Sequence, residues 1–166
     1  MKTFQNFISD CQGIVDELFP WDLEEMMKSQ PHLLLVDIRE PYEFEKLHIE
    51  GSNNIPRGIL ESACDYGYDD TVPELVTARD KEVILICRSG NRSVLAVCTM
   101  QRMGFQLVKS LKTGVRGWNE CDFPLQNIHK QTVELEEAAA LLTAQIKPEQ
   151  MPPCNDISFT KSPNFS

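Results

Sequence analysis

The residues most able to do chemistry lie in one short segment in the middle of the chain. Four apolar residues at 83–86 predict a short buried strand, and Cys87 directly follows them. A helix is expected to begin near Ser93. A thiol between a strand end and a helix start faces converging backbone N–H groups and the positive end of a helix dipole, which favour its reactive thiolate form. Cys87 is therefore the candidate nucleophile.

The loop after Cys87 carries an arginine on either side of a glycine. Arg88 and Arg92 flank Gly90, in a chain whose net charge is −9. Cations near a cysteine favour the thiolate and can also hold an anionic reactant. A merely structural cysteine is disfavoured, because charged arginines are poor neighbours for a buried packing residue. The candidate binding residues of this loop are Arg88, Ser89, Gly90, Asn91, Arg92 and Ser93.

The composition of the chain limits what it can bind. It has 166 residues, of which 42% are hydrophobic, and this supports one domain with a core plus extensions. No run of lysines and arginines is long enough to follow a phosphate backbone, so nucleic-acid binding is disfavoured. No stretch approaches the roughly 20 apolar residues of a membrane span. The N-terminus has no apolar signal core and the six cysteines are widely spaced, so we expect a cytoplasmic protein.

Other reactive side chains have structural explanations that we favour. Cys98 lies among apolar residues of the expected helix, and Cys64 precedes a loop, where it could resolve an oxidised Cys87 but is better explained as a packing residue. Asp37 and Arg39 close the first main strand, and we expect an ion pair that supports the active-site loop rather than a catalytic carboxylate. The histidines are scattered and no Cys-x-x-Cys spacing occurs, so no metal or cofactor is expected.

Strand patterns alternate with helix patterns along the chain. Apolar runs predict strands at 33–38 and 83–86, and two further strands are expected at 54–56 and 106–111, with short helices between them. This alternation indicates an α/β fold with a mostly parallel sheet covered by helices on both faces. Ligands bind such sheets outside the carboxyl ends of the strands, where Cys87 is expected to lie.

Both ends of the chain extend beyond this alternating core. Residues 1–19 place apolar side chains at helical spacing, which predicts an amphipathic helix that packs on the domain, with a dimer or partner interface as the alternative. The core domain is expected at 20–125. Residues 126–166 are expected to hold one more amphipathic helix, with a disordered tail in the last twenty residues. The apolar residues concerned are Phe4, Phe7, Ile8, Cys11, Ile14, Val15 and Leu18 at the N-terminus, and Leu135, Ala138, Leu142 and Ile146 near the C-terminus.

Five segments, which make up four motifs in order, resemble the rhodanese domain family. Residues 34–44 (Leu-Leu-Val-Asp-Ile-Arg-Glu-Pro-Tyr-Glu-Phe) and 48–56 (His-Ile-Glu-Gly-Ser-Asn-Asn-Ile-Pro) resemble its N-terminal signature. Residues 87–93 (Cys-Arg-Ser-Gly-Asn-Arg-Ser) resemble its active-site loop, and 103–105 and 114–118 resemble its C-terminal landmarks. Two residues depart from the pattern: Leu47 stands where glycine is common, and Val115 replaces the second glycine of a frequent pair.

The resemblance implies a three-layer rhodanese-like fold with a five-stranded sheet and a sulfurtransferase that works through a persulfide on Cys87. The thiolate would take the outer sulfur of thiosulfate or a related donor, and Arg88 and Arg92 would hold the departing sulfonate charge. The N–H groups from Arg88 to Ser93 would cradle the persulfide sulfur. A thiol, cyanide or a protein acceptor would then remove it, in two steps through a covalent intermediate.

Two alternatives stay open. A Cdc25-type cysteine phosphatase shares this architecture, but such enzymes place arginine six residues after the cysteine, where this chain has Ser93 and its arginine comes one residue earlier. The shorter loop suits a single sulfur atom better than a phosphate. A persulfide relay or binding module acting with a protein partner is the other alternative. Modules that only bind have usually lost the cysteine, so the presence of Cys87 argues against them, whereas a relay would keep it.

Overall fold

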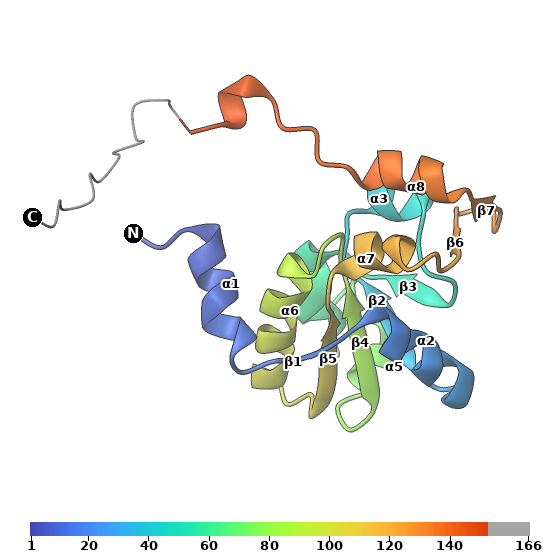
Figure 1. Ribbon diagram of the computed structural model, residues 1–166. Helices are drawn as coiled ribbons and strands as arrows, with labels where there is room; N and C mark the ends of the chain where they lie inside the picture. Colours follow the sequence, from blue (N-terminus) through green and yellow to red (C-terminus); the bar gives the residue numbers. More distant parts are fainter. Residues whose placement is uncertain (153–166) are drawn as a thin grey trace, which may run out of the picture.

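Five parallel strands form the central sheet. The computed structural model describes residues 1–152. The strand order is β1-β5-β4-β2-β3, so β4, which leads into Cys87, is the middle strand. The α/β fold and the five-stranded parallel sheet expected from the sequence are both present (Figure 1). The strands are β1 (Asp16–Leu18), β2 (Leu34–Asp37), β3 (Ser52–Asn54), β4 (Glu82–Ile86) and β5 (Leu107–Leu111).

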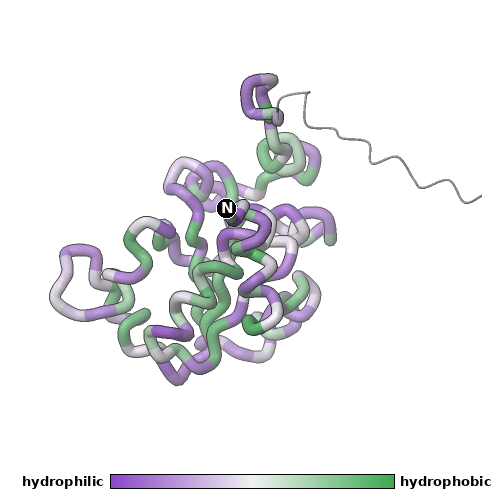
Figure 2. Tube along the Cα trace, turned by 90° about the vertical axis from the view of Figure 1, so that its left-hand side faces the viewer, coloured by the Kyte–Doolittle hydropathy of each residue, from purple (hydrophilic) through white to green (hydrophobic). Residues whose placement is uncertain are grey.

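Helices cover both faces of the sheet because successive residues of the buried strands point to opposite sides. In β4, Val83 and Leu85 join one apolar cluster, and Ile84 and Ile86 join the other. This explains why β4 appears in the sequence as a continuous apolar run. Figure 2 shows the apolar strands at the centre of the molecule. The helices are α1 (Phe4–Gln12), α4 (Leu60–Ala63), α5 (Pro73–Val76) and α6 (Asn91–Arg102) on the first face, and α2 (Pro20–Ser29), α7 (Gly114–Glu120) and α8 (Leu135–Leu142) on the second, with α3 (Pro41–Lys46) beside α8.

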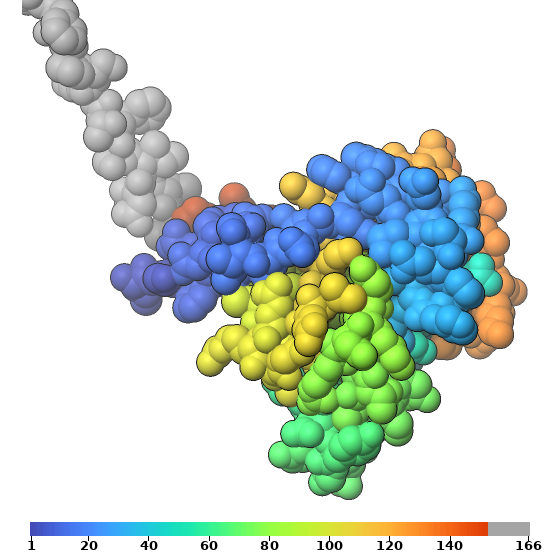
Figure 3. All heavy atoms as spheres, turned by 90° about the horizontal axis from the view of Figure 1, so that it is seen from below, coloured from blue at the N-terminus to red at the C-terminus, as the bar shows by residue number. Residues whose placement is uncertain are grey.

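The N-terminal segment corrects the sequence prediction. The helix ends at Gln12, and Asp16–Leu18 forms the edge strand β1, which pairs in parallel with β5. Val15 and Leu18 are buried in opposite clusters, as alternation across a strand requires. Pairing with the open edge of β5 satisfies the backbone here, and helical spacing in the sequence could not reveal that partner. Helix α1 itself contacts α6, and Figure 3 shows it as a ridge at the edge of the domain.

The C-terminal segment contributes to the core. Strands β6 (Leu125–Gln126) and β7 (Thr132–Val133) form a small antiparallel pair. The backbone of His48 bonds Gln126 in both directions, at 2.8 and 3.0 Å. Helix α8 packs on α7 and buries Ala138 and Leu142, whereas Ile146, which was expected on the same helix, lies beyond its end and is exposed. Most of the tail predicted to be disordered, residues 153–166, lies outside the described residues.

Candidate active site

Cys87 lies at the carboxyl end of the central strand, directly before the loop that leads into α6. Its side chain is 1% exposed. The loop turns at Gly90, which has φ +88° and stands directly before the first residue of α6. Only glycine adopts this left-handed conformation without steric cost. The thiol therefore sits near the positive end of the α6 dipole, as the sequence predicted.

Ser93 is the direct neighbour of the Cys87 sulfur. Its backbone N lies 3.4 Å and its Oγ 3.3 Å from Cys87 Sγ. The same hydroxyl donates to the carbonyl of Gly90 at 2.9 Å and lies 2.8 Å from Ser110 Oγ on β5. Ser110 is fully buried and was missed by the sequence analysis. The sequence feature that could have identified Ser110 is a small polar residue at a position of a predicted strand where an apolar residue is expected.

Arg92 is bound by a carboxylate that the sequence analysis also missed. Its Nη1 and Nη2 each donate to one oxygen of Glu43 at 2.8 Å. Burial works against ionisation of Glu43, but hydrogen bonds and charge from Arg92 outweigh it, so the pKa of Glu43 is lowered. The hydrogen bonds to Glu43 raise the pKa of Arg92, burial opposes this rise, and the charge of Glu43 adds to it. Glu43 also accepts from the Glu40 N–H and so holds the start of α3 against the Cys87 loop.

Arg88 has a different environment. Its side chain is half-buried, and it forms no ion pair with any carboxylate in residues 1–152. It lines an opening of about 350 Å³ together with Ser89, Asn91 and Arg92. Phe4 of α1 lies on the rim of the same opening. Arg88 is thus an accessible cation at the mouth of the loop.

Asp37 and Arg39 form a buried ion pair at the end of β2. Arg39 Nη2 lies 2.6 Å from Asp37 Oδ2 and also donates to the carbonyl of Leu47 at 2.7 Å. The Asn54 amide donates to the backbone carbonyls of both Asp37 and Arg39. Leu47 has an extended backbone with φ −162°, which any residue adopts, so no glycine is required there.

The first turn of α7 is hydrogen-bonded to the Cys87 loop. Val115 N donates to the carbonyl of Cys87, and Arg116 N to that of Arg88, both at 2.9 Å. A Cβ on Gly114 would lie 2.3 Å from the Cys87 oxygen, so only glycine fits. The two consecutive residues with positive φ are Thr113 (+68°) and Gly114 (+60°), while Val115 lies inside α7. The two adjacent positions whose backbone favours glycine are therefore 113 and 114. The residue that departs from the glycine pair of the family is Thr113, not Val115 as expected from the sequence.

The remaining described cysteines are free thiols. Cys64 is fully buried, and burial is the main cause that raises its pKa to about 11. A thiol in that state is a poor nucleophile, which suits packing better than resolution of an oxidised Cys87. Cys98 is half-buried against the first apolar cluster.

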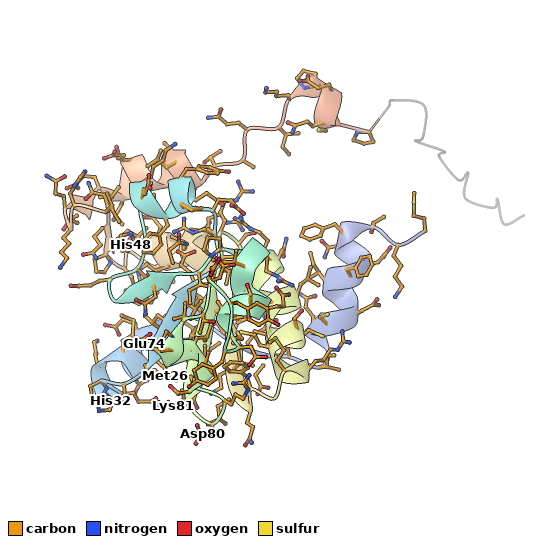
Figure 4. The ribbon with its side chains drawn as sticks, turned by 180° about the vertical axis from the view of Figure 1, so that it is seen from behind. Met26, His32, His48, Glu74, Asp80 and Lys81 are labelled. Carbon is orange, nitrogen blue, oxygen red and sulfur yellow. The ribbon has the colours of Figure 1, made fainter. Side chains whose placement is uncertain are left out.

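Other kinds of site were also sought in residues 1–152. This part of the chain contains no group of three or more ligating side chains that could hold a metal ion. Figure 4 shows His48 beside α3, far from His32, which lies with Asp80 and Lys81 at the opposite end of the molecule. Within the same residues, the helices are too short or too polar to cross a membrane.

The geometry agrees with the comparisons with known proteins. A family model described as the rhodanese-like domain matches residues 20–121. A Bacillus subtilis protein provisionally named as the sulfur carrier YrkF is 35% identical over 110 residues, which cover 66% of this chain and 54% of that one. The adenylyltransferase and sulfurtransferase MOCS3 of Drosophila virilis is 32% identical over 108 residues, 63% of this chain and 23% of that one. The chain thus spans about half or less of the length of these relatives.

Solved structures show the same fold. A Rhodopseudomonas palustris protein of unknown function, described as a possible tyrosine phosphatase, superposes with a TM-score of 0.70 and 28% identity, over 76% of this chain and 96% of that one. The thiosulfate sulfurtransferase of Pseudomonas aeruginosa has a TM-score of 0.61 and 18% identity, over 84% of this chain and 26% of that one. With the family model matching more than half of its residues, this chain belongs to the rhodanese-like domain family.

Proposed function

We propose that the protein is a sulfurtransferase that carries sulfane sulfur on Cys87, from thiosulfate or a related donor to a thiol or cyanide acceptor. The observation that carries the proposal is the position of Cys87 Sγ. It lies at the end of the central strand, before α6, with Ser93 N and Oγ at 3.4 and 3.3 Å. Relatives named as sulfur carriers and sulfurtransferases support a role in sulfur transfer.

In the first step, the Cys87 thiolate attacks the outer sulfur of thiosulfate. A bond forms between the two sulfur atoms, and the bond to the sulfonate sulfur breaks. Sulfite leaves with the bonding electron pair, and Cys87 holds a persulfide. The loop N–H groups from Arg88 to Ser93 stabilise the terminal sulfur, and the left-handed turn at Gly90 allows the loop to curve around it.

The two loop arginines have different roles in this proposal. Glu43 compensates the charge of Arg92 and uses two of its donors, so Arg92 serves mainly to hold the loop against α3. Arg88 has no such carboxylate in the described residues and lines the opening, so it carries most of the interaction with the sulfonate. Asp37 and Arg39 support the neighbouring strand end.

The proposal also covers the molecule that accepts the sulfur and the compartment in which the protein works. A thiol or cyanide takes the terminal sulfur, or a protein partner receives it directly in a relay. Helices α1 and α8, next to the loop, leave surface for such a partner. A reducing compartment such as the cytoplasm suits a catalyst that must keep Cys87 as a free thiol.

The test is persulfide formation on Cys87. The protein is incubated with thiosulfate, and intact-protein mass spectrometry is expected to show the addition of one sulfur atom. Cys87→Ser removes the nucleophile and is expected to show none, while Cys64→Ser serves as the control that still gains sulfur. Wild-type protein that stays unmodified with thiosulfate, polysulfide and an organic persulfide would refute the proposal.

Phosphatase activity is the second candidate, because the Rhodopseudomonas palustris neighbour is described as a possible tyrosine phosphatase. Here the loop has Arg92 five residues after Cys87 and Ser93 at the sixth position. The Arg92 guanidinium is also already bound by Glu43, which leaves fewer donors to wrap a phosphate. Hydrolysis of an aryl phosphate decides the matter: robust turnover that Cys87→Ser abolishes would reverse the ranking.

A further inference from the structure

A second cavity opens beside the Cys87 loop. It has a volume of about 160 Å³ and lies between α3 and α8, which run side by side in Figures 1 and 4. We call it the α3–α8 pocket. It shares Tyr42, Glu43 and Arg88 with the opening at the loop, so the two cavities adjoin. A molecule could therefore place one end at the loop and the other in this pocket.

The charges around the α3–α8 pocket do not cancel. Arg39 is paired with Asp37, and Glu43 with Arg92. Lys46 and Arg88 also line the pocket, and neither has a carboxylate partner in the part of the chain that the structure describes. Two uncompensated cations thus face one small cavity in a chain of net charge −9. This local excess favours a ligand with an anionic group.

The opposite wall of the pocket is apolar. It is formed by Leu141 and Leu142 of α8, with the ring of Tyr42 nearby. The volume is below the roughly 300–1,000 Å³ of sites for drug-sized ligands, so the pocket suits a short arm rather than a large ring system. Helix α8 lies outside the residues that the family model matches.

We propose that the α3–α8 pocket binds the carboxylate-bearing arm of a small thiol acceptor, with Lys46 and Arg88 on the carboxylate and Leu141 against its methylene groups. The inference rests on the proposed function. The acceptor thiolate attacks the terminal sulfur of the Cys87 persulfide, and a new sulfur–sulfur bond forms. The bond to Cys87 Sγ breaks, Cys87 leaves as a thiolate with the electron pair, and the acceptor departs as a persulfide.

The test compares three thiols of similar size and different charge. Cys87 is loaded with thiosulfate, the donor is removed, and discharge is followed with mercaptopropionate, mercaptoethanol and cysteamine. Each rate is divided by the rate of the same thiol with a small-molecule persulfide, which removes differences in intrinsic reactivity. Because two cations face the pocket, wild-type protein is expected to favour the anionic over the neutral thiol by about tenfold.

Variants locate this preference in the pocket. Lys46→Ala and Leu141→Asp are expected to reduce the anionic-to-neutral ratio to about one or two, and Lys46→Arg to restore most of it. Lys81→Ala is the matched control, since Figure 4 places Lys81 at the opposite end of the molecule from α3 and α8. The ratio is measured within each variant, so it does not depend on the amount of folded protein. Equal normalised rates for the three thiols in wild-type protein would overturn the inference.

A second measurement separates this inference from the proposed function. Methylthiopropionate has the carboxylate arm but no thiol, and its binding is followed by chemical-shift changes in the backbone amides. Saturable shifts at Lys46 and Leu141, lost in Lys46→Ala, support the pocket even if Cys87 accepts no sulfur from any donor. Absence of these shifts at millimolar concentration refutes the pocket, whether or not the persulfide forms.

Discussion

Glu43 binds Arg92 through both oxygens of its carboxylate, at 2.8 Å each, and so joins α3 to the loop that carries Cys87. The two residues are 49 positions apart in the sequence. The pair is partly shielded, with 18% of the Glu43 side chain and 33% of the Arg92 side chain exposed. A bidentate pair of this kind fixes geometry as well as contributing energy. The shape of the active-site loop therefore depends on a residue outside it.

Glu43→Gln is expected to lower the free energy of unfolding by about 1–2 kcal/mol at pH 7, since it weakens two charge-assisted hydrogen bonds. The folded-state pKa of Glu43 lies below its ordinary value of 4.5. Its contribution to stability is therefore fully present above pH 4.5 and is lost as the pH falls through the folded-state pKa. Urea unfolding at several pH values between 3 and 7 measures the difference between variant and wild type.

The control for this prediction is Glu45→Gln, an exposed carboxylate on the same helix. It is expected to change stability by less than about 0.5 kcal/mol at every pH. A stability difference for Glu43→Gln that stays constant down to pH 3 would show that the ion pair is not its origin.

The roles of the two loop arginines can be separated by kinetics. Replacing Arg92 alone would leave Glu43 as an uncompensated negative charge at the mouth, so the clean comparison uses the double variant Glu43→Gln/Arg92→Gln, which leaves the net charge unchanged. Arg88→Gln is expected to lower kcat/KM for thiosulfate, relative to an uncharged organic trisulfide, by about tenfold or more. The double variant is expected to lower this ratio by at most about threefold. Equal losses in the two variants would mean that both arginines hold the donor anion.

Local sequence signals predicted the centre of the site, because Cys87 depends on neighbours in the chain. The run at 83–86, the cysteine and the following helix are all contiguous, and the structure shows them as β4, Cys87 and α6. The pairing of β1 with β5 and of Glu43 with Arg92 joins segments far apart in sequence. Such contacts depend on the tertiary arrangement, which the helical spacing of residues 1–19 could not indicate.

The backbone conformation of Thr113 is a further feature that local sequence patterns do not predict. Its φ of +68° is the left-handed region, which costs a β-branched residue about 1–2 kcal/mol. Thr113→Gly removes that strain. It also makes the unfolded chain more flexible, which lowers the free energy of unfolding by about 0.5–1 kcal/mol. We expect a net gain of about 0.5–1 kcal/mol in unfolding free energy, measured by urea denaturation.

The matched control for Thr113→Gly is Thr132→Gly in strand β7, where the threonine is exposed and its φ is not positive. The same substitution there is expected to lower stability by about 0.5–1 kcal/mol, because only the cost in the unfolded state remains. A loss of stability in Thr113→Gly equal to that in Thr132→Gly would indicate that the Thr113 side-chain contacts outweigh the backbone strain.

Ser110 is expected to affect sulfur loading although it does not touch the thiol. The Ser93 hydroxyl has one proton and three neighbours: the Gly90 carbonyl, Cys87 Sγ and Ser110 Oγ. The Gly90 carbonyl only accepts, so Ser93 must turn its proton away from it to donate to the thiolate. Ser110 supplies a second hydroxyl, which can donate a hydrogen bond to Ser93 Oγ while Ser93 donates to the thiolate, or accept one from Ser93. Ser110→Ala is expected to slow persulfide formation with thiosulfate about three- to tenfold, the effect of one net hydrogen bond.

A double-mutant cycle distinguishes this positioning role from general destabilisation. Ser93→Ala is expected to reduce the loading rate more than Ser110→Ala, because Ser93 Oγ contacts the sulfur directly. If Ser110 acts only through Ser93, then Ser93→Ala/Ser110→Ala loads no more slowly than Ser93→Ala alone. Ser110→Thr keeps the hydroxyl and is expected to recover most of the wild-type rate. Additive losses in the double variant would instead assign Ser110 an independent effect on the packing of β5 against α6, since Ser110 lies in β5, Ser93 lies in α6 and these two elements are in contact.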